Sequence, residues 1–181
     1  MRMPETKILT WDGVKPWRAA LRQAGCRLVL TNGCFDLLHR GHVDYLARAR
    51  QLGDALLLAV NSDASVRTLK GSDRPLNPEH DRLFVLAGLE SVDAVVVFDS
   101  LRADEVIAMA EPELYAKGGD ISLATLPAEE RHALDACGAR IVFLPFLDGF
   151  STTVTLQKAR RQRAGAIQLK AGSCGTASGV I

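Results

Sequence analysis

The sequence lacks an excess of charge of either sign. Its 181 residues carry 22 Lys and Arg against 21 Asp and Glu, which gives a formal net charge of +1 at pH 7. Proteins that hold nucleic acid or an anionic membrane through their overall field need a basic surface. We therefore expect no nucleic-acid partner and no membrane partner, and any anionic ligand must be held by a local cluster of charges.

Long apolar segments are also missing. The longest apolar runs, at 55–60 and 94–98, are far shorter than the roughly 20 residues that a membrane helix needs. The first residues do not form an apolar stretch with a cleavage site, so we find no secretory signal. Cysteine is scarce, with 4 in the chain, and there is no CxxC pair or zinc-finger spacing. These absences favour a cytoplasmic protein without a disulfide framework.

Short apolar runs alternate with helical patterns, and this alternation is typical of βαβ units. We predict strands at 27–31, 55–60, 94–98, 114–116 and 141–145. Helices are predicted at about 14–24, 41–52, 77–89, 103–110, 123–137 and 149–163, and 64–75 is predicted to be a short helix that runs into a mobile loop. This order predicts a Rossmann-like, doubly wound α/β fold with a five-stranded parallel sheet. We expect one domain over 1–163 and a disordered tail at 164–181, which is rich in small residues and has no acid.

Two of these helices carry specific expectations about burial and capping. In the first helix we expect a buried stripe, made of Trp17, Ala20, Leu21 and Ala24. In the helix after residue 77 we expect an Asn77 cap with Pro78 in the first turn. Its inward side chains should be Leu83, Phe84, Leu86, Ala87 and Leu89.

Polar residues gather where the predicted strands end. Ligands of open parallel sheets bind beyond the carboxyl ends of the strands, so we expect these residues to converge on one site. They are Asn32, Gly33, Asp36, His39 and His42; Asn61, Asp63, Lys70 and Arg74; Lys117, Gly118, Gly119 and Asp120; and Ser151, Thr152 and Thr153.

The sharpest motif is His39-Arg40-Gly41-His42, at the predicted start of a helix. Histidines three apart can direct both rings to one side, next to the free N–H groups and the positive end of the helix. Gly41 leaves room for the close approach of a phosphate. We interpret the motif as a phosphate site. The alternatives are that the histidines are capping or core residues, or that they join Asp36 as metal ligands.

This motif resembles the HxGH signature of the nucleotidylyltransferase superfamily. The resemblance covers about residues 8–160 and continues through 59–66, 69–71, 74–79, 116–120 and 149–153. Together these segments are similar to the family of D-glycero-β-D-manno-heptose 1-phosphate adenylyltransferases, which make ADP-heptose for lipopolysaccharide. The HxGH motif by itself identifies only the superfamily.

The resemblance implies in-line attack of a sugar 1-phosphate on the α-phosphorus of ATP, which releases pyrophosphate. It implies catalytic roles for His39, His42 and Lys70. It implies nucleotide contacts for Asn32, Gly33, Cys34, Phe35, Gly41, Lys117, Gly118, Gly119, Asp120, Ser151, Thr152 and Thr153. Substrate or phosphate contacts are implied for Asp36, Asn61, Asp63, Arg74 and Arg82. It further implies Mg²⁺ held through the phosphates without a protein cage, and it is compatible with a homodimer.

Simpler structural interpretations stand beside these roles. Lys70, Arg74 and Arg82 also suit a solvated surface, and Ser151 also suits a helix cap. Three other functions remain open: a related nucleotidylyltransferase that uses CTP and glycerol 3-phosphate or another phosphorylated alcohol, a non-catalytic nucleotide-binding module, and a metal-dependent hydrolase.

The sequence departs from the family pattern near its fourth predicted strand. Ala116 stands where Val is usual, Ile121 stands where Tyr is usual, and the segment 122–140 lacks the usual acidic-hydrophobic pattern. The departures leave the acceptor specificity open. The family also occurs fused behind a sugar kinase, and we expect any kinase that serves this chain to be a separate protein.

Overall fold

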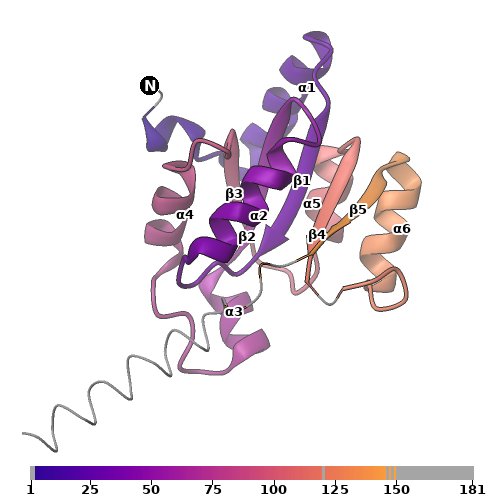
Figure 1. Ribbon diagram of the computed structural model, residues 1–181. Helices are drawn as coiled ribbons and strands as arrows, with labels where there is room; N and C mark the ends of the chain where they lie inside the picture. The colour runs from indigo at the N-terminus through magenta and orange to yellow at the C-terminus, as the bar shows by residue number, and fades with distance from the viewer. Residues whose placement is uncertain (1–2, 120, 146, 148, 150–181) are drawn as a thin grey trace, which may run out of the picture.

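The computed structural model describes residues 3–119, 121–145, 147 and 149. Its strands form one five-stranded parallel sheet in the order β3-β2-β1-β4-β5 (Figure 1). The strands are β1 (Leu28–Gly33), β2 (Ala55–Asn61), β3 (Ala94–Phe98), β4 (Leu114–Gly118) and β5 (Arg140–Leu144). The first strand, β1, is the central one. The next two strands, β2 and β3, extend the sheet on one side of it, and β4 and β5 extend it on the other. The predicted parallel α/β fold is therefore confirmed, and its topological switch point lies between β1 and β4.

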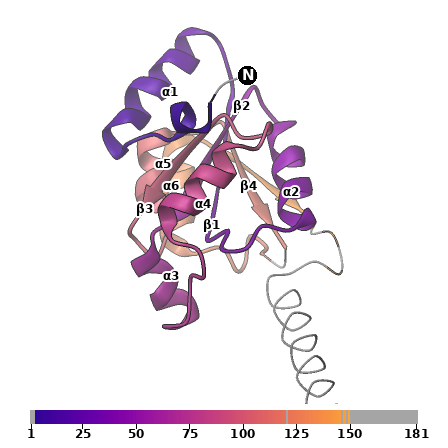
Figure 2. The ribbon, with the colours of Figure 1, turned by 90° about the vertical axis from the view of Figure 1, so that its left-hand side faces the viewer.

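Helices cover both faces of the sheet (Figures 1 and 2). One core contains residues of α1 (Val14–Gln23), α5 (Asp104–Ala110) and α6 (Ala128–Cys137), and the other contains residues of α2 (Arg40–Arg50) and α4 (Glu79–Ala87). Successive strand residues serve opposite cores, since Leu28 and Leu30 belong to the first and Val29 to the second. The remaining helix, α3 (Asp63–Lys70), follows β2 directly. Two short 3₁₀ helices, Pro4–Lys7 and Trp11–Gly13, precede α1.

The buried stripe of α1 differs from the prediction. Ala20 and Ala24 are exposed, whereas Val14 and Arg18 are buried. Arg18 Nε donates to the Ala110 carbonyl at 2.9 Å, and its guanidinium pairs with Glu113. An arginine with internal acceptors thus takes a core position that periodicity assigns to apolar residues.

The expected start and burial of the helix after residue 77 are also corrected. It begins at Glu79 with Pro78 as N-cap, because the side chain of Asn77 donates to the Asp36 carbonyl at 2.9 Å and does not cap the helix. Phe84, predicted to face inward, is 46% exposed. The buried stripe of α4 consists of Arg82, Leu83, Leu86 and Ala87.

The predicted helix over 123–137 begins later, at Ala128, with Pro127 as its N-cap. Residues 122–126 form a turn, in which Thr125 and Leu126 donate backbone hydrogen bonds to the Ser122 carbonyl. The helix predicted over 149–163 and the tail at 164–181 lie outside the described residues.

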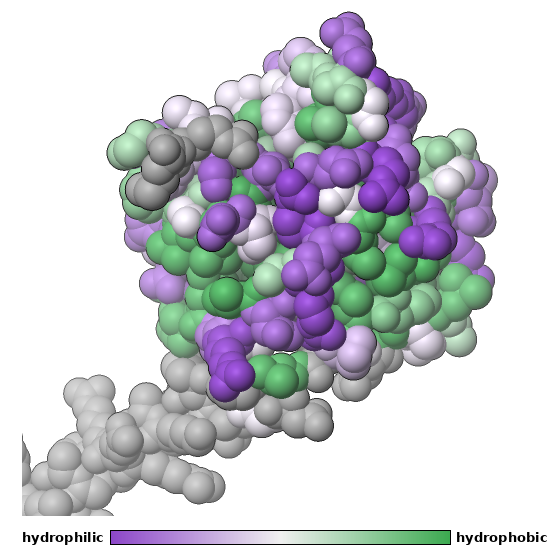
Figure 3. All heavy atoms as spheres, turned by 45° about the horizontal axis from the view of Figure 1, so that its top comes forward, coloured by the Kyte–Doolittle hydropathy of each residue, from purple (hydrophilic) through white to green (hydrophobic). Residues whose placement is uncertain are grey.

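Long apolar helices and exposed apolar side chains are the features of the described residues that bear on membrane or protein partners. No helix in the described part of the chain is long and apolar enough to cross a membrane. Exposed large apolar side chains are spread over separate elements, among them Val43 on α2, Phe84 on α4 and Phe143 on β5. On the face shown in Figure 3, a hydrophilic band separates the apolar areas. The homodimer therefore stays a prediction.

Candidate active site

A cavity of about 350 Å³ lies beyond the carboxyl ends of β1 and β4, at the topological switch point. Its volume falls in the range of small-molecule sites. The lining includes predicted site residues from four parts of the chain: Asn32, Gly33, Cys34, Phe35, His42, Lys70, Lys117 and Gly118. Tyr45 and Ile121 complete it. A smaller hollow of about 130 Å³ shares Phe35 with this cavity and is lined by residues of α4 and of the loop after β1.

The loop after β1 turns sharply at Phe35, which has a left-handed backbone conformation with a φ of 45°. The turn places its ring over Gly33, where an added Cβ would lie 2.8 Å from Phe35 Cε2. The same ring packs against His42, with 5.2 Å between ring centroids. Gly33 therefore makes room for an aromatic ring that supports a histidine of the site.

The two motif histidines stand at the start of α2, with His39 as its N-cap residue. Their rings stack with centroids 3.8 Å apart and an interplanar angle of 19°, so both project to one side, as the spacing predicts. The Nδ1 atoms of His39 and His42 are buried and have no hydrogen-bond partner within the described residues. Buried polar atoms without a partner are uncommon in proteins and fit a site that receives a polar ligand. Gly41, in the first turn of α2, is buried.

Both histidines favour the neutral form. Burial lowers the pKa of His42 to about 4, helped by the nearby charges of His39 and Lys70 and opposed by a contact with the Leu37 backbone. Burial also lowers the pKa of His39. A neutral imidazole carries one N–H donor, and a bound polyanion would raise both pKa values. The pair can therefore gain positive charge when negative charge accumulates beside it.

Lys70 reaches the cavity from the last turn of α3, and its position depends on how that helix is anchored. The Ser62 hydroxyl caps the helix by accepting from the Ser65 N–H. The Asn61 amide nitrogen donates to the Ser65 hydroxyl at 3.0 Å, and the Cys34 thiol lies 3.8 Å from the Asn61 amide oxygen. Burial raises the pKa of Cys34, so it stays a neutral thiol. Asn61 and Cys34 thus tie α3 to the loop after β1.

This geometry agrees with comparisons to known proteins. Residues 30–155 match the cytidylyltransferase-like family, a match that spans both histidines, Lys70 and Lys117. The chain belongs to this family. The predicted nucleotidylyltransferase superfamily and enzyme class are therefore confirmed.

Curated relatives share the name bifunctional protein HldE. The chain is 44% identical over 158 residues to HldE of Escherichia coli (strain K12 / DH10B), which covers 87% of the chain and 33% of the relative. It is 46% identical over 154 residues to HldE of Citrobacter koseri, with coverages of 85% and 32%. The protein from Nitratiruptor is 44% identical over 140 residues, with coverages of 77% and 29%. The chain thus spans about a third of the length of these relatives.

A solved structure extends the likeness to the fold. The lipopolysaccharide core biosynthesis protein of Thermoplasma volcanium superposes with a TM-score of 0.57 at 25% sequence identity. The match covers 68% of this chain and 98% of that protein. The fold of this chain is therefore shared with almost the whole of that solved protein.

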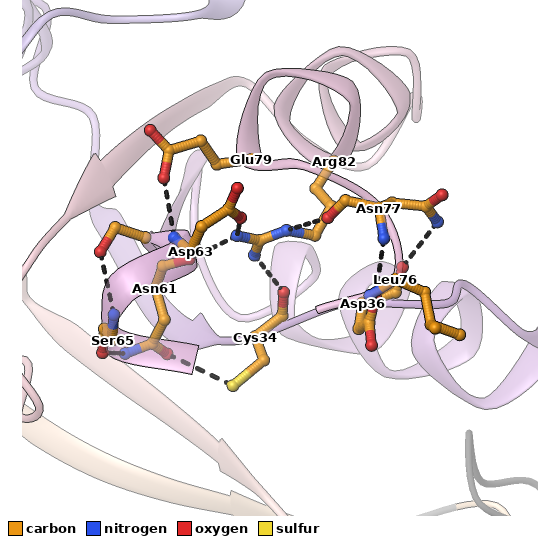
Figure 4. Close-up of polar contacts among 10 residues, drawn as sticks. Cys34, Asp36, Asn61, Asp63, Ser65, Leu76, Asn77, Glu79 and Arg82 are labelled. Carbon is orange, nitrogen blue, oxygen red and sulfur yellow. Dashed lines mark hydrogen bonds and ion pairs between the residues drawn. The ribbon is translucent and has the colours of Figure 1, made fainter. Parts of the chain in front are cut away.

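Beside the cavity of this cytidylyltransferase-like chain, Arg82 forms the centre of a buried hydrogen-bond network (Figure 4). Its guanidinium donates to the backbone carbonyls of Cys34, Asn61 and Asn77 at 2.6, 2.8 and 3.1 Å. It also pairs with Asp63 at 2.8 Å, and its side chain is 0% exposed. All three nitrogens are therefore engaged by protein acceptors. In this conformation Arg82 and Asp63 join the loop after β1, the end of β2 and α4. The phosphate contact suggested for Arg82 stays a prediction.

Asp36 and Arg74 form a second network, which closes the loop between α3 and α4. The buried Asp36 carboxylate pairs with Arg74 and accepts from the backbone N–H groups of Leu76 and Asn77 at 2.7 and 3.2 Å. Both of its oxygens thus have hydrogen-bond partners. One of them neutralises the charge of Arg74, which the sequence predicts to contact phosphate. The loop that carries Arg74 is held against the loop that follows β1.

Lys117, on β4, also lines the cavity, and its Nζ donates to the Asn32 amide oxygen at 2.7 Å. Gly118 lines the cavity next to it, and Gly119 has a left-handed backbone conformation with a φ of 78°. These three residues and Asn32 are thus brought together, as the strand ends predict. Asp120, Ser151, Thr152 and Thr153 lie outside the described residues.

Sequence reasoning missed two polar residues of this region. The Tyr45 hydroxyl donates to the Ala116 carbonyl at 3.0 Å and lies 2.7 Å from the Thr31 hydroxyl, and burial raises its pKa to about 12. Its place one turn after His42 on α2 was the signal that could have identified it. The second missed residue, Glu130 on α6, contacts Lys117 and has no local signal, because it comes from a distant helix.

Proposed function

We propose that this chain transfers AMP from ATP to D-glycero-β-D-manno-heptose 1-phosphate, which yields ADP-heptose and pyrophosphate for lipopolysaccharide synthesis. The observation that carries the proposal is the stacked His39–His42 pair, whose buried Nδ1 atoms lack partners beside a cavity that also receives Lys70 and Lys117. The HldE relatives and the lipopolysaccharide core biosynthesis structure support the choice of acceptor.

The reaction needs positioning and charge stabilisation and no covalent intermediate. A phosphate oxygen of the sugar 1-phosphate attacks the α-phosphorus of ATP and forms a new P–O bond. The bond between the α-phosphorus and the bridging oxygen breaks, and its electrons leave with pyrophosphate. Negative charge grows on the α- and β-phosphate oxygens during this step. Donors fixed around those oxygens lower the barrier, because they do not have to reorganise as the charge develops.

The chain's own residues take distinct parts in this proposal. His39 and His42 donate hydrogen bonds to the α- and β-phosphates and gain proton affinity as the charge grows. Lys70, exposed at the end of α3, neutralises the leaving pyrophosphate. The nucleotide contacts are Asn32, Gly33, Cys34, Phe35, Gly41, Lys117, Gly118, Gly119, Asp120, Ser151, Thr152 and Thr153. Arg82, Asp63 and Asn61 hold the loops that carry these groups, and Arg74 is available to substrate when Asp36 releases it.

We expect the only metal ion in this reaction to be the one that ATP carries. In the part of the chain that the structure describes, no group of three or more His, Cys, Asp or Glu residues could hold a metal ion. The described residues therefore do not fit a protein-held cation, and no step above depends on one. We expect Mg²⁺ to accompany ATP through its phosphate oxygens.

The test is a direct assay of product. The purified chain is incubated with ATP, Mg²⁺ and D-glycero-β-D-manno-heptose 1-phosphate, and pyrophosphate release and ADP-heptose are measured. CTP is the matched alternative nucleotide, since the family is named for cytidylyl transfer, and glycerol 3-phosphate is the alternative acceptor. We expect turnover with ATP and the heptose phosphate. Turnover with CTP and glycerol 3-phosphate alone would contradict the proposal.

The His39→Ala variant separates an enzyme from a binding module. Removing a fixed donor to the transition state should lower kcat by about 100-fold, while ATP binding persists. His80→Ala is the matched control, because the His80 side chain is 78% exposed on α4. A His39→Ala enzyme with wild-type kcat would mean that the stacked pair is not catalytic.

A further inference from the structure

A buried ion pair connects the wall of the cavity to α6. Lys117 Nζ lies 3.1 Å from Glu130 Oε2, and the two side chains are 10% and 3% exposed. The other Glu130 oxygen accepts from the Ala103 backbone N–H at 3.1 Å, next to the start of α5. The carboxylate is thus fixed on both sides and cannot turn away from the lysine without leaving a buried donor unpaired.

The same lysine orients an amide that lines the cavity. The Asn32 amide oxygen accepts from Lys117 Nζ at 2.7 Å and from the Tyr115 hydroxyl at 2.8 Å. The Tyr115 hydroxyl also lies 3.0 Å from Glu130 Oε2. Because the Lys117 ammonium can only donate, the amide atom beside it must be the oxygen, and the NH₂ group of Asn32 points elsewhere. The only groups that Asn32 can offer to a ligand are therefore N–H donors.

Lys117 is a donor as well. An ammonium has three N–H groups, and two of them serve Asn32 and Glu130. The third has no acceptor within the described residues, and Lys117 lines the cavity. The side chains of Asn32 and Lys117 therefore both offer hydrogen-bond donors to a ligand at this end of the cavity.

We propose that Glu130 is a positioning residue, which holds Lys117 charged and, through Lys117, fixes Asn32, so that these two side chains select hydrogen-bond acceptors of a ligand. This inference rests on the proposed function for the identity of the ligand, ATP. The atoms selected are phosphate or hydroxyl oxygens, or unprotonated ring nitrogens. Glu130 itself acts through Lys117 and does not touch the ligand.

The charges around Lys117 explain why it needs this partner. Burial lowers the pKa of Lys117, the Arg102 charge lowers it further, and Glu130 raises it. Tyr115 lies beside it, and Lys70 and His42 line the same cavity. Replacing Glu130 by Gln keeps the shape and an acceptor for the Ala103 N–H but removes the negative charge. The Lys117 pKa should then fall, so that the ammonium is lost at a lower pH than in the wild type.

The experiment measures the Kd of ATP by calorimetry, without heptose phosphate, from about pH 7.5 to about pH 9.5. For Glu130→Gln we expect affinity close to wild type at the lower pH and a loss that grows as the pH rises, up to about tenfold for a pKa that falls by one unit. Glu129→Gln, an exposed neighbour on the same helix, is the matched control and should follow the wild type.

The pH dependence of ATP binding distinguishes a positioning role of Glu130 from a merely structural one. A Glu130→Gln protein that follows the wild type at every pH, or loses the same factor at every pH, would overturn the inference. If this variant does not fold, Lys117→Met decides. It should bind ATP about tenfold more weakly at the lower pH, because a charge-assisted hydrogen bond is lost, and wild-type affinity would overturn the inference.

The result is also distinguishable from failure of the proposed function. ATP binding that depends on Glu130, without formation of ADP-heptose, would support the inference and reject the proposed reaction. No ATP binding by the wild-type chain would reject both.

Discussion

Replacing Arg82 by Met tests whether this residue holds the site together or binds phosphate. The substitution keeps an apolar stem of similar length but removes every donor of the guanidinium. Three carbonyls, those of Cys34, Asn61 and Asn77, then lose a buried donor, and Asp63 loses its cation. Breaking a buried, hydrogen-bonded ion pair on one side costs about 3–5 kcal/mol.

Asp63 lowers the expected value within that range. Its side chain is 24% exposed, so water can solvate part of its charge after the arginine is gone, whereas the Arg82 side chain is 0% exposed. We therefore expect the free energy of unfolding to fall by about 3 kcal/mol. For a domain of this size each kcal/mol shifts Tm by roughly 2–4 °C, so Tm should fall by roughly 6–12 °C.

Urea unfolding followed by circular dichroism gives the free energy, and thermal unfolding gives Tm. Arg67→Met is the matched control, because Arg67 is exposed on α3, and it should change stability by less than about 0.5 kcal/mol. The reasoning would be refuted by an Arg82→Met protein as stable as the control with a raised KM for ATP, since that pair of results describes an arginine free to bind phosphate.

Two further predictions concern the cationic and titratable groups of the cavity. Lys70→Ala should lower kcat by about tenfold or more and leave Tm within about 1 °C of the wild type, because the side chain is exposed; a Tm lower by several degrees would show that Lys70 is structural. His42 has a folded-state pKa of about 4 against an ordinary 6.5, so between these values the unfolded chain binds more protons. The free energy of unfolding should therefore rise with pH through this window and level off above it. His42→Phe should remove this component of the slope, and an unchanged slope in urea titrations across the window would assign it to other groups.

The positions of the strands and the edge that carries the site follow from local patterns. A continuous apolar run such as 55–60 predicts a strand that is buried on both faces, and the structure buries this run fully. The sequence alone therefore identifies it as a central strand. The HxGH spacing likewise places His39 and His42 on one side of a helix start by helix geometry alone. The lowered pKa of His42, by contrast, depends on its burial and on the charge of Lys70, which comes from another helix.

Local patterns fail where a polar side chain finds distant acceptors. Arg18 occupies a buried position on α1 because carbonyls of residues 110 and 111 lie within its reach. Asn77 does not form the predicted cap, and its side-chain NH₂ group donates to the Asp36 carbonyl. Each choice depends on how loops far apart in the sequence pack together, which helical periodicity and capping preferences do not contain.

The sequence by itself determined a parallel α/β fold, a site at the carboxyl ends of its strands and the residue types that suit phosphate. These follow from periodicity, glycine placement and the direction of parallel strands, all of which act over short distances. The tertiary structure decided which cations are free to act. Arg82 is committed to three carbonyls and a carboxylate, Arg74 is paired with Asp36, and Lys117 is held by Glu130. A charge takes its role from the partners that surround it, and those partners are assembled only when the chain folds.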